Sequence, residues 1–97
     1  MSNRLSLNTE IELFKSIEDL NEEVQNLINS ACKSRLNAYA TYSNFLVGAA
    51  LLLENGEIVC GNNQENAAYP SGLCAERTAV FYANSKFPKQ KILMMAI

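Results

Sequence analysis

The sequence predicts one α/β domain in which helices pack on the faces of a sheet. Three observations carry this prediction: a helical apolar stripe in the first third, two apolar runs joined by an Asn-Gly turn, and a second helical segment followed by a third apolar run. A chain of 97 residues, of which 48% are hydrophobic, fits a single small globular domain.

The first fifteen residues are an N-terminal extension, and the domain itself is expected at 16–97. Leu5, Leu7, Ile11 and Leu13 alternate with polar residues in this extension. Such alternation is compatible with an edge strand.

A long helix is expected from Ser16 to about Tyr39. Ser16 is a suitable N-cap because acidic residues follow it in the first turn, where they complement the helix dipole. The apolar residues then recur every three or four positions, at Leu20, Val24, Leu27, Ile28 and Ala31. This stripe favours core packing against a sheet over a cofactor site.

Two strands follow the first helix. Residues 45–53 form an almost unbroken apolar run, which is typical of a strand buried on both faces. Gly48 within it indicates a close backbone approach. Asn55-Gly56 predicts a hairpin, and the returning strand begins at Ile58.

A second helix and a third strand complete the pattern. The Pro70-Ser71-Gly72 loop leads into a helix from Leu73 to about Ser85, and residues 92–97 form another apolar run. A helical crossover would make the second and third strands a parallel, right-handed pair. Because the chain stops inside this apolar strand, we expect it to be truncated.

Charge and cysteine content limit the classes of function that fit this sequence. Eight Lys and Arg against ten Asp and Glu give a net charge of −2, which argues against a nucleic-acid groove. The sequence has neither a membrane-spanning apolar run nor a signal-peptide pattern, so we expect a cytosolic protein without membrane contacts. Three widely spaced cysteines, Cys32, Cys60 and Cys74, predict free thiols.

Cys74 and Glu76 are the candidate reactive pair. A position in the first turn of a helix favours the thiolate of Cys74, the form that ligates metals or attacks electrophiles. The chain contains no histidine, so a proton-transferring group must be a carboxylate, and Glu76 is the best placed. The alternative is an inert, buried Cys74 with Glu76 on a solvated face.

Residues 61–66 form a polar cluster after the second strand. Such clusters usually make a turn. On an extended segment, however, Asn63 and Glu65 point the same way and could together bind either a vicinal or a single hydroxyl of a polar ligand.

Three blocks of this sequence closely resemble the small homotetrameric cytidine deaminases: YSNFLVGAA at 42–50, NQEN at 63–66 and YPSGLCAERT at 69–78. The resemblance runs from about Glu22 to the last residue. It implies a three-layer fold, a mixed sheet with helices on both faces, here truncated after the third core strand. It also implies zinc, of whose ligands only Cys74 is present, because the family's P-C-x-x-C motif is absent from this chain.

The resemblance also implies roles for individual residues. Glu76 is the catalytic proton shuttle, and Arg77 offsets the charge of the thiolate site. Substrate binding falls to Phe45 as a wall beside the base, to Ala75, and to Asn63 and Glu65 on the ribose hydroxyls. Tyr69, Phe81 and Tyr82 are the expected interface aromatics, although Phe81 and Tyr82 could instead belong to the subunit's own core.

The implied activity is hydrolytic deamination of cytidine and deoxycytidine in pyrimidine salvage, with a zinc-activated water attacking C4. Two alternatives stay open: a zinc-free nucleoside-binding module and a purely structural subunit. A deaminase of single-stranded or flipped bases is disfavoured by the acidic charge balance and the lack of a basic, aromatic-lined stripe.

Overall fold

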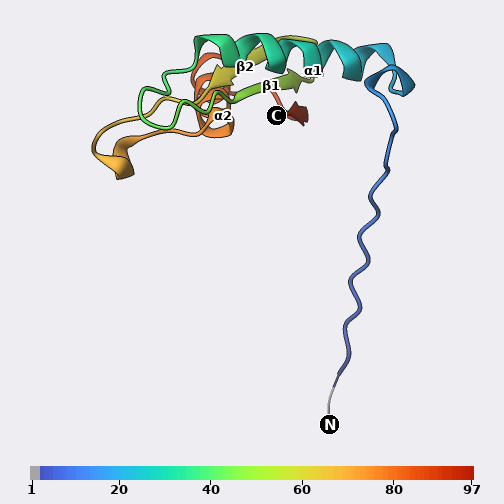
Figure 1. The fold of residues 1–97 in the computed structure, drawn as a ribbon. Coiled ribbons are helices and arrows are strands. Elements are labelled where there is room, and N and C mark those ends of the chain that lie inside the picture. Colours follow the sequence, from blue (N-terminus) through green and yellow to red (C-terminus); the bar gives the residue numbers. More distant parts are fainter. Residues whose placement is uncertain (1–2) are drawn as a thin grey trace.

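The computed structural model describes residues 3–97, and in Figure 1 the helices pack against a small sheet. The prediction of an α/β fold with helices on both faces is confirmed. The regular elements are α1 (Glu22–Ser34), β1 (Gly48–Leu53), β2 (Ile58–Asn62), α2 (Ala75–Lys86) and β3 (Ile92–Ala96). Single 3-10 turns lie at Ile17–Asp19, Arg35–Asn37 and Tyr69–Ser71.

The sheet has the strand order β2-β1-β3, and both outer strands run antiparallel to β1. β2 and β3 therefore share one direction, as the helical crossover requires, but the predicted direct pairing between them is wrong. Likewise, the expected mixed sheet is purely antiparallel within residues 3–97. The reason is burial: all six residues of β1 are buried, so this strand takes the centre.

The alternating side chains of β1 form two separate cores. Ala50 and Leu52 face α1, where Leu27 and Ala31 are buried against them. On the other face, Leu51 and Leu53 pack with β2 and with a row of small α2 residues, Ala75, Ala79 and Ala83. Because these side chains are small, α2 can lie close to the sheet.

Two glycines set how closely the helices approach. A Cβ atom on Gly48 would lie 2.6 Å from the backbone nitrogen of Arg35 and would clash with the carbonyl of Ala31, so the predicted close approach is confirmed. A Cβ atom on Gly61 would lie 2.5 Å from the backbone nitrogen of Ala79. Each helix thus rests on a strand backbone at a glycine.

The first helix is shorter than predicted. Ser16 accepts a hydrogen bond from the Glu18 amide at 3.3 Å, but it caps only the 3-10 turn. An extended residue, Leu20, then interrupts the helix, and α1 begins after the N-cap Asn21, whose Oδ1 accepts from the Val24 amide at 2.9 Å. At its other end α1 stops at Ser34 and gives way to a 3-10 turn.

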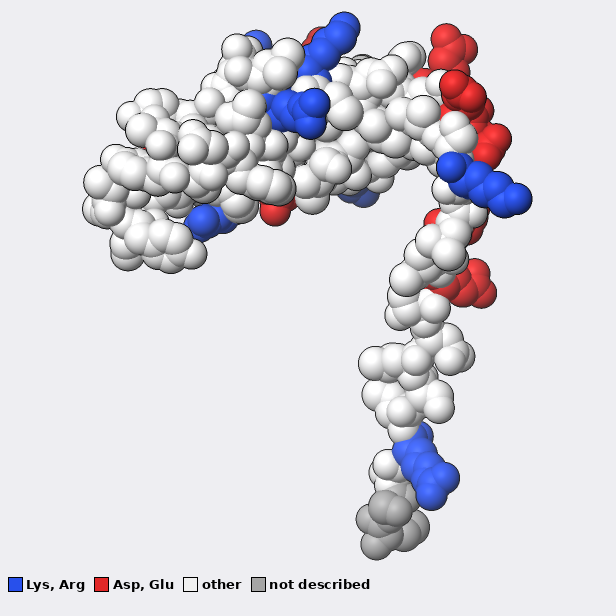
Figure 2. Space-filling view, in the orientation of Figure 1, with Lys and Arg blue, Asp and Glu red and all other residues white. Residues whose placement is uncertain are grey.

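Residues 3–15 extend away from the body of the molecule in Figure 1 and form no strand, so the expected edge strand is not found there. Their apolar side chains are exposed, Leu5 at 86% and Leu13 at 91%. Figure 2 shows acidic side chains gathered along this extension and at the start of α1. None of the described helices is both long and apolar enough to cross a membrane.

Candidate active site

The candidate site lies where two irregular segments run side by side, residues 38–47 (the connector) and residues 63–74 (the return loop). The Tyr39 amide donates to the Asn63 carbonyl at 2.9 Å, and the Glu65 amide donates to the Tyr39 carbonyl at 2.8 Å. Paired backbone bonds of 2.9 and 2.8 Å between Gln64 and Leu73 close the return loop on itself. These bonds hold the walls of an open pocket.

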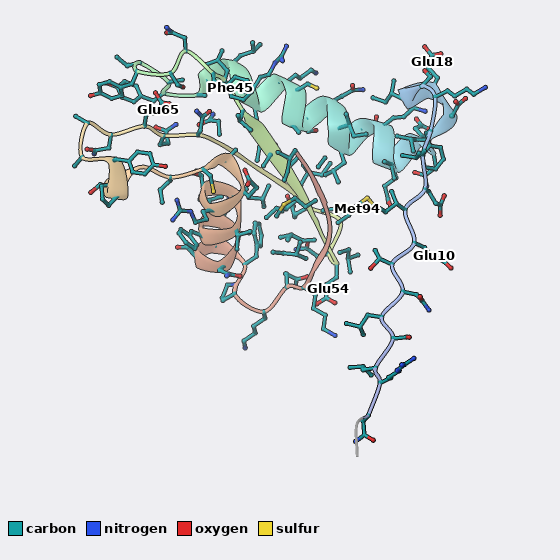
Figure 3. All side chains as sticks on the ribbon, turned by 60° about the horizontal axis from the view of Figure 1, so that its bottom comes forward. Glu10, Glu18, Phe45, Glu54, Glu65 and Met94 are labelled. Carbon is teal, nitrogen blue, oxygen red and sulfur yellow. The ribbon has the colours of Figure 1, made fainter. Side chains whose placement is uncertain are left out.

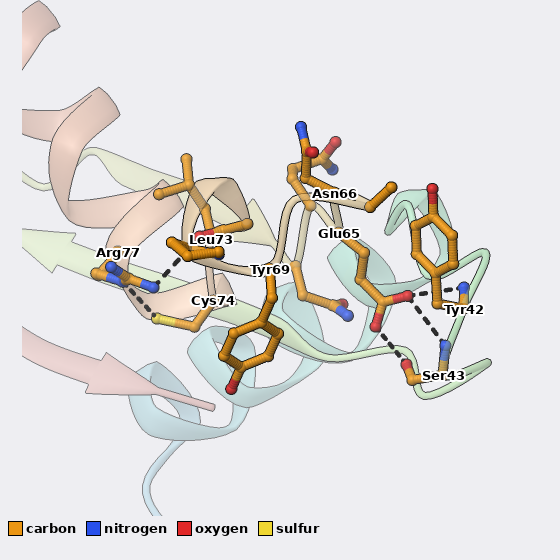
Figure 4. Close-up of a pocket in the computed structure, with 13 residues that line it drawn as sticks. Tyr42, Ser43, Glu65, Asn66, Tyr69, Leu73, Cys74 and Arg77 are labelled. Carbon is orange, nitrogen blue, oxygen red and sulfur yellow. Dashed lines mark hydrogen bonds between the residues drawn. The ribbon is translucent and has the colours of Figure 1, made fainter.

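The pocket has a volume of about 880 Å³ and takes its lining from the connector, the return loop and the first turn of α2. Figure 4 shows Glu65 near Tyr42 and Ser43 at one side, and Cys74 beside Arg77 at the other. We name these two sides the Glu65 end and the Cys74 end. The lining residues that carry side-chain chemistry are Tyr42, Ser43, Asn63, Gln64, Glu65, Asn66, Tyr69, Cys74 and Arg77.

Asn63 joins the return loop to the connector through both atoms of its amide. Its Oδ1 accepts a hydrogen bond from the Val47 amide at 2.9 Å, and its Nδ2 donates to the Phe45 carbonyl at 2.9 Å. The side-chain amide thereby accepts and donates like the backbone of a paired strand residue. Asn63 therefore has a structural role beyond that of an ordinary turn residue.

Glu65 is bound by the connector at three points. Its Oε1 accepts from the amides of Tyr42 and Ser43 at 2.9 and 3.1 Å, and its Oε2 accepts from the Ser43 hydroxyl at 2.5 Å (Figure 4). The Ser43 hydroxyl, followed by the Ser43 amide, lowers the pKa of the Glu65 carboxyl, because both donors stabilise the ionised form. Glu65 is therefore a carboxylate near neutral pH.

Asn63 and Glu65 both reach toward the connector. The structure thus places them along one side of the return loop, at the Glu65 end of the pocket. Each is already engaged by backbone groups of the chain, which the sequence pattern did not predict.

Cys74 is the N-cap residue of α2, one position before the predicted first turn. Arg77 Nε donates to the Cys74 Sγ at 3.3 Å, and Arg77 Nη2 donates to the Gly72 carbonyl at 3.4 Å. The hydrogen bond from Arg77 lowers the pKa of the Cys74 thiol, while the negative charge of Glu76 acts in the opposite direction. Cys74 lines the pocket and is only half-buried, so the full burial assumed by the alternative is not observed.

Not every predicted site residue lines this pocket. Glu76 follows Cys74 on α2 and is half-buried, while Ala75 is fully buried in the core beneath the helix. Phe45 is 70% exposed and borders a second cavity of about 300 Å³, between the end of α1 and the start of β1. In Figure 3, Phe45 and Glu65 lie at the same end of the molecule.

The three expected interface aromatics are all exposed. Tyr69 is 92% exposed on the return loop, and Phe81 and Tyr82 are about half exposed on α2. Lys86 lies over the ring of Tyr82, 5.8 Å from its centroid. Phe81 and Tyr82 therefore lie outside the two cores of the described chain.

The described residues do not form a complete metal site. Residues 3–97 contain no group of three or more Cys, Asp or Glu side chains placed to hold a metal ion. Among the residues that line the pocket, Cys74 offers a thiol, a common zinc ligand, and the hydrogen bond from Arg77 lowers its pKa. Cys32 and Cys60 are exposed and lie elsewhere, as the sequence indicated.

Sequence reasoning did not assign Tyr42 and Ser43 to the site. Both hold Glu65, and Ser43 also accepts a hydrogen bond from the Phe45 amide at 3.0 Å. The available signal was a Ser-Asn pair in a connector, the composition of a side-chain-stabilised turn. Nothing in it indicated a partner more than twenty residues away.

Comparison with known proteins places this geometry in a family. Residues 21–97 match the family model described as the cytidine and deoxycytidylate deaminase zinc-binding region. The chain belongs to this family.

Individual relatives agree with this assignment. The chain is 52% identical over 62 residues to the cytidine deaminase of Halalkalibacterium halodurans and 54% identical over 63 residues to that of Sporosarcina psychrophila. These matches cover 64% and 65% of the chain but only 47% and 46% of the relatives. The chain thus spans about half the length of the curated relatives it matches.

Solved structures show the same fold. The cytidine deaminase from Mycobacterium tuberculosis superimposes with a TM-score of 0.72 at 35% identity, covering 77% of this chain and 60% of that one. The enzyme from Burkholderia pseudomallei gives a TM-score of 0.63 at 46% identity, covering 70% of this chain and 52% of that one.

Proposed function

We propose that the intact protein is a zinc-dependent deaminase that hydrolyses cytidine and deoxycytidine to uridine and deoxyuridine. The observation that carries this proposal is the Cys74 end of the pocket, where a thiol at a helix N-terminus accepts a hydrogen bond from Arg77 and is followed two residues later by Glu76. The relatives named cytidine deaminase support the same activity.

Cys74 would be one zinc ligand, and the others would come from outside the residues described here. Zinc, when bound, would supply a water acidic enough to act as a nucleophile at neutral pH. Arg77 offsets negative charge by donating to the sulfur. Its guanidinium also anchors the loop through Gly72, which keeps the donor directed at Cys74.

Glu76 would carry the protons. Its carboxylate accepts the proton of the attacking water, delivers it to N3 of the cytosine ring, and then assists the departure of ammonia. The place of Glu76 at the start of α2, next to Cys74 but not needed as a ligand, suits this role.

The Glu65 end would hold the sugar. Glu65 and Asn63 are fixed by the connector before a ligand arrives, so little ordering is needed on binding. Phe45, whose backbone carbonyl is held by Asn63, would form a wall beside the base, and Ala75 would contribute from the start of α2.

We further propose a cytosolic homotetramer that works in pyrimidine salvage. Tyr69, Phe81 and Tyr82 would lie between subunits, since all three are exposed large aromatic side chains. Light scattering on the intact protein should give the mass of four subunits, whereas a fully active monomer at micromolar concentration would contradict the assembly.

The function is tested by two measurements on the purified intact protein. Elemental analysis should give about one zinc per subunit, and conversion of cytidine to uridine should be followed by ultraviolet absorbance. Nucleoside binding without zinc or turnover would instead favour the inactive binding module. If the protein neither binds nor deaminates nucleosides, the structural subunit would be favoured.

A further inference from the structure

We propose that Ser43 is a positioning residue that links the Glu65 carboxylate to the backbone of Phe45. The positions of the Glu65 end of the pocket and of the proposed base wall, Phe45, are thereby coupled. This inference rests on the proposed function. It assigns a role to Ser43, which lies within the block at 42–50 but was given no role by the resemblance.

The Ser43 hydroxyl makes two hydrogen bonds in opposite directions. It donates to Glu65 Oε2 at 2.5 Å and accepts from the Phe45 amide at 3.0 Å. The Ser43 amide also donates to Glu65 Oε1 at 3.1 Å. A single side chain therefore links the carboxylate to the residue two positions further along the connector.

The backbone between them is bent to make this link. Asn44 has a φ of +58°, the left-handed region that asparagine adopts more readily than most residues. This turn brings the Phe45 amide back onto the Ser43 hydroxyl. Figure 4 shows the bonds from Tyr42 and Ser43, directly before this turn, to the Glu65 carboxylate.

Phe45 is then held on both sides of its own backbone. Its amide is bound by Ser43, and its carbonyl accepts from Asn63 Nδ2 at 2.9 Å. The two residues proposed to bind the sugar, Asn63 and Glu65, are therefore the same two that fix the backbone of the base wall, Asn63 directly and Glu65 through Ser43. A substitution of Asn63 or Glu65 should therefore also alter how the backbone of Phe45 is held.

The same bonds limit what Glu65 can accept from a ligand. An ionised carboxylate offers about four lone-pair positions, and the connector occupies three of them. About one position is left, which suits a single hydroxyl donor. Of the two ligand types compatible with the sequence, a single or a vicinal hydroxyl, the geometry favours the single hydroxyl at Glu65.

The test compares three variants of the intact protein: Ser43→Ala, Ser43→Thr and, as control, Ser30→Ala. Ser30 lies on α1, and its hydroxyl donates only to the Asn26 carbonyl one turn earlier. Because hydrogen bonds to charged groups are strong, Ser43→Ala should raise KM for cytidine about tenfold with kcat within about twofold of wild type. Ser43→Thr, which keeps the hydroxyl, should recover most of the loss, and Ser30→Ala should change neither constant.

A KM for Ser43→Ala no higher than that of Ser30→Ala would overturn the proposal. So would a loss in kcat equal to the rise in KM, or a threonine variant as impaired as the alanine variant. These results would leave Ser43 with a loop-folding role only.

Amide hydrogen exchange tests the link even if the protein does not deaminate cytidine. Glu65 does not contact the Phe45 amide, yet Glu65→Gln should speed exchange of that amide several-fold, because the Ser43 hydroxyl loses its charged acceptor. Unchanged exchange at Phe45 in Glu65→Gln would overturn the link. Absence of turnover in the wild-type protein would overturn the proposed function alone.

Discussion

The two ends of the pocket differ in how much of their structure the chain supplies. At the Glu65 end, three hydrogen bonds from the connector hold one carboxylate, and two more hold the Asn63 amide. At the Cys74 end, Arg77 is the hydrogen-bond donor to the thiol, and the described residues complete no metal site. The side chains of the Glu65 end are therefore held by bonds within this chain, whereas the zinc proposed for the Cys74 end would need ligands besides Cys74.

The two ends are joined by the backbone bonds between Gln64 and Leu73 and by the packing of α2 on the sheet. β2 ends directly before Asn63, and α2 begins directly after its N-cap Cys74, so the packing of α2 on β2 helps to set the distance between the two ends. That packing includes a close approach of Gly61 to the backbone of Ala79. The comparison can thus be tested at either end or at the junction.

The largest expected effect is at the Cys74 end. Glu76→Gln in the intact protein should lower kcat by roughly 10²- to 10⁴-fold, the usual contribution of a general acid–base group, with KM and zinc content little changed. Steady-state kinetics and elemental analysis measure these quantities. Cys74→Ala is the matched contrast, since it should lower zinc content itself.

Near wild-type turnover in Glu76→Gln would show that another group moves the protons. Glu57→Gln, a change in the β1–β2 turn, controls for the loss of one negative charge and should leave kcat unaltered.

The next effect concerns the junction. Gly61→Ala should destabilise the protein by about 1–3 kcal/mol, because the added Cβ would meet the backbone of α2 at 2.5 Å and the helix must move. Gly72→Ala is the control, since its added Cβ meets nothing closer than 3.5 Å and its φ of −71° suits alanine. Urea unfolding of both variants measures the difference, and equal midpoints would contradict the proposed role of Gly61.

The sequence predicted the elements well where one local pattern decides them. β1 was predicted from its apolar run, the hairpin from Asn55-Gly56, and the close approach from Gly48. The order of the strands was harder to predict. The helical crossover fixes only that β2 and β3 run in the same direction, and this holds whether the two strands are neighbours or have β1 between them. The break at Leu20 was missed because the apolar stripe continues through it.

The site residues also divide into those that a local motif identifies and those that only the folded structure brings together. Cys74, Arg77, Asn63 and Glu65 were all named from their motifs, and all line the pocket. Ser43 was not named, because its role depends on a carboxylate that is 22 residues away in sequence and reaches it only after folding. Motifs identify reactive side chains, whereas the groups that hold them depend on tertiary contacts.

A third prediction concerns the Glu65 end. Glu65→Gln should raise KM for cytidine about tenfold, as expected for loss of a charged hydrogen-bond acceptor, with a much smaller change in kcat. Glu57→Gln again removes one charge without touching the pocket and should leave KM unchanged. Equal effects of the two variants would contradict a sugar-binding role for Glu65.

The smallest effect is the pH dependence of the Glu65 end. Hydrogen bonds from Ser43 and Tyr42 hold the pKa of Glu65 below its ordinary value of 4.5 in the folded protein. A depressed folded pKa stabilises the native state fully above the unfolded value, and this stabilisation is lost as the pH falls through the folded value. The urea midpoint of wild type should therefore exceed that of Glu65→Gln by a constant amount above about pH 5, and the difference should shrink below pH 4.5. Because Ser43 is the main cause of the lowered pKa, the pH-dependent part of this difference should be smaller when Ser43→Ala is present in both proteins. A difference that grows on acidification, or one that Ser43→Ala leaves in place, would show that the connector does not hold Glu65 as a carboxylate.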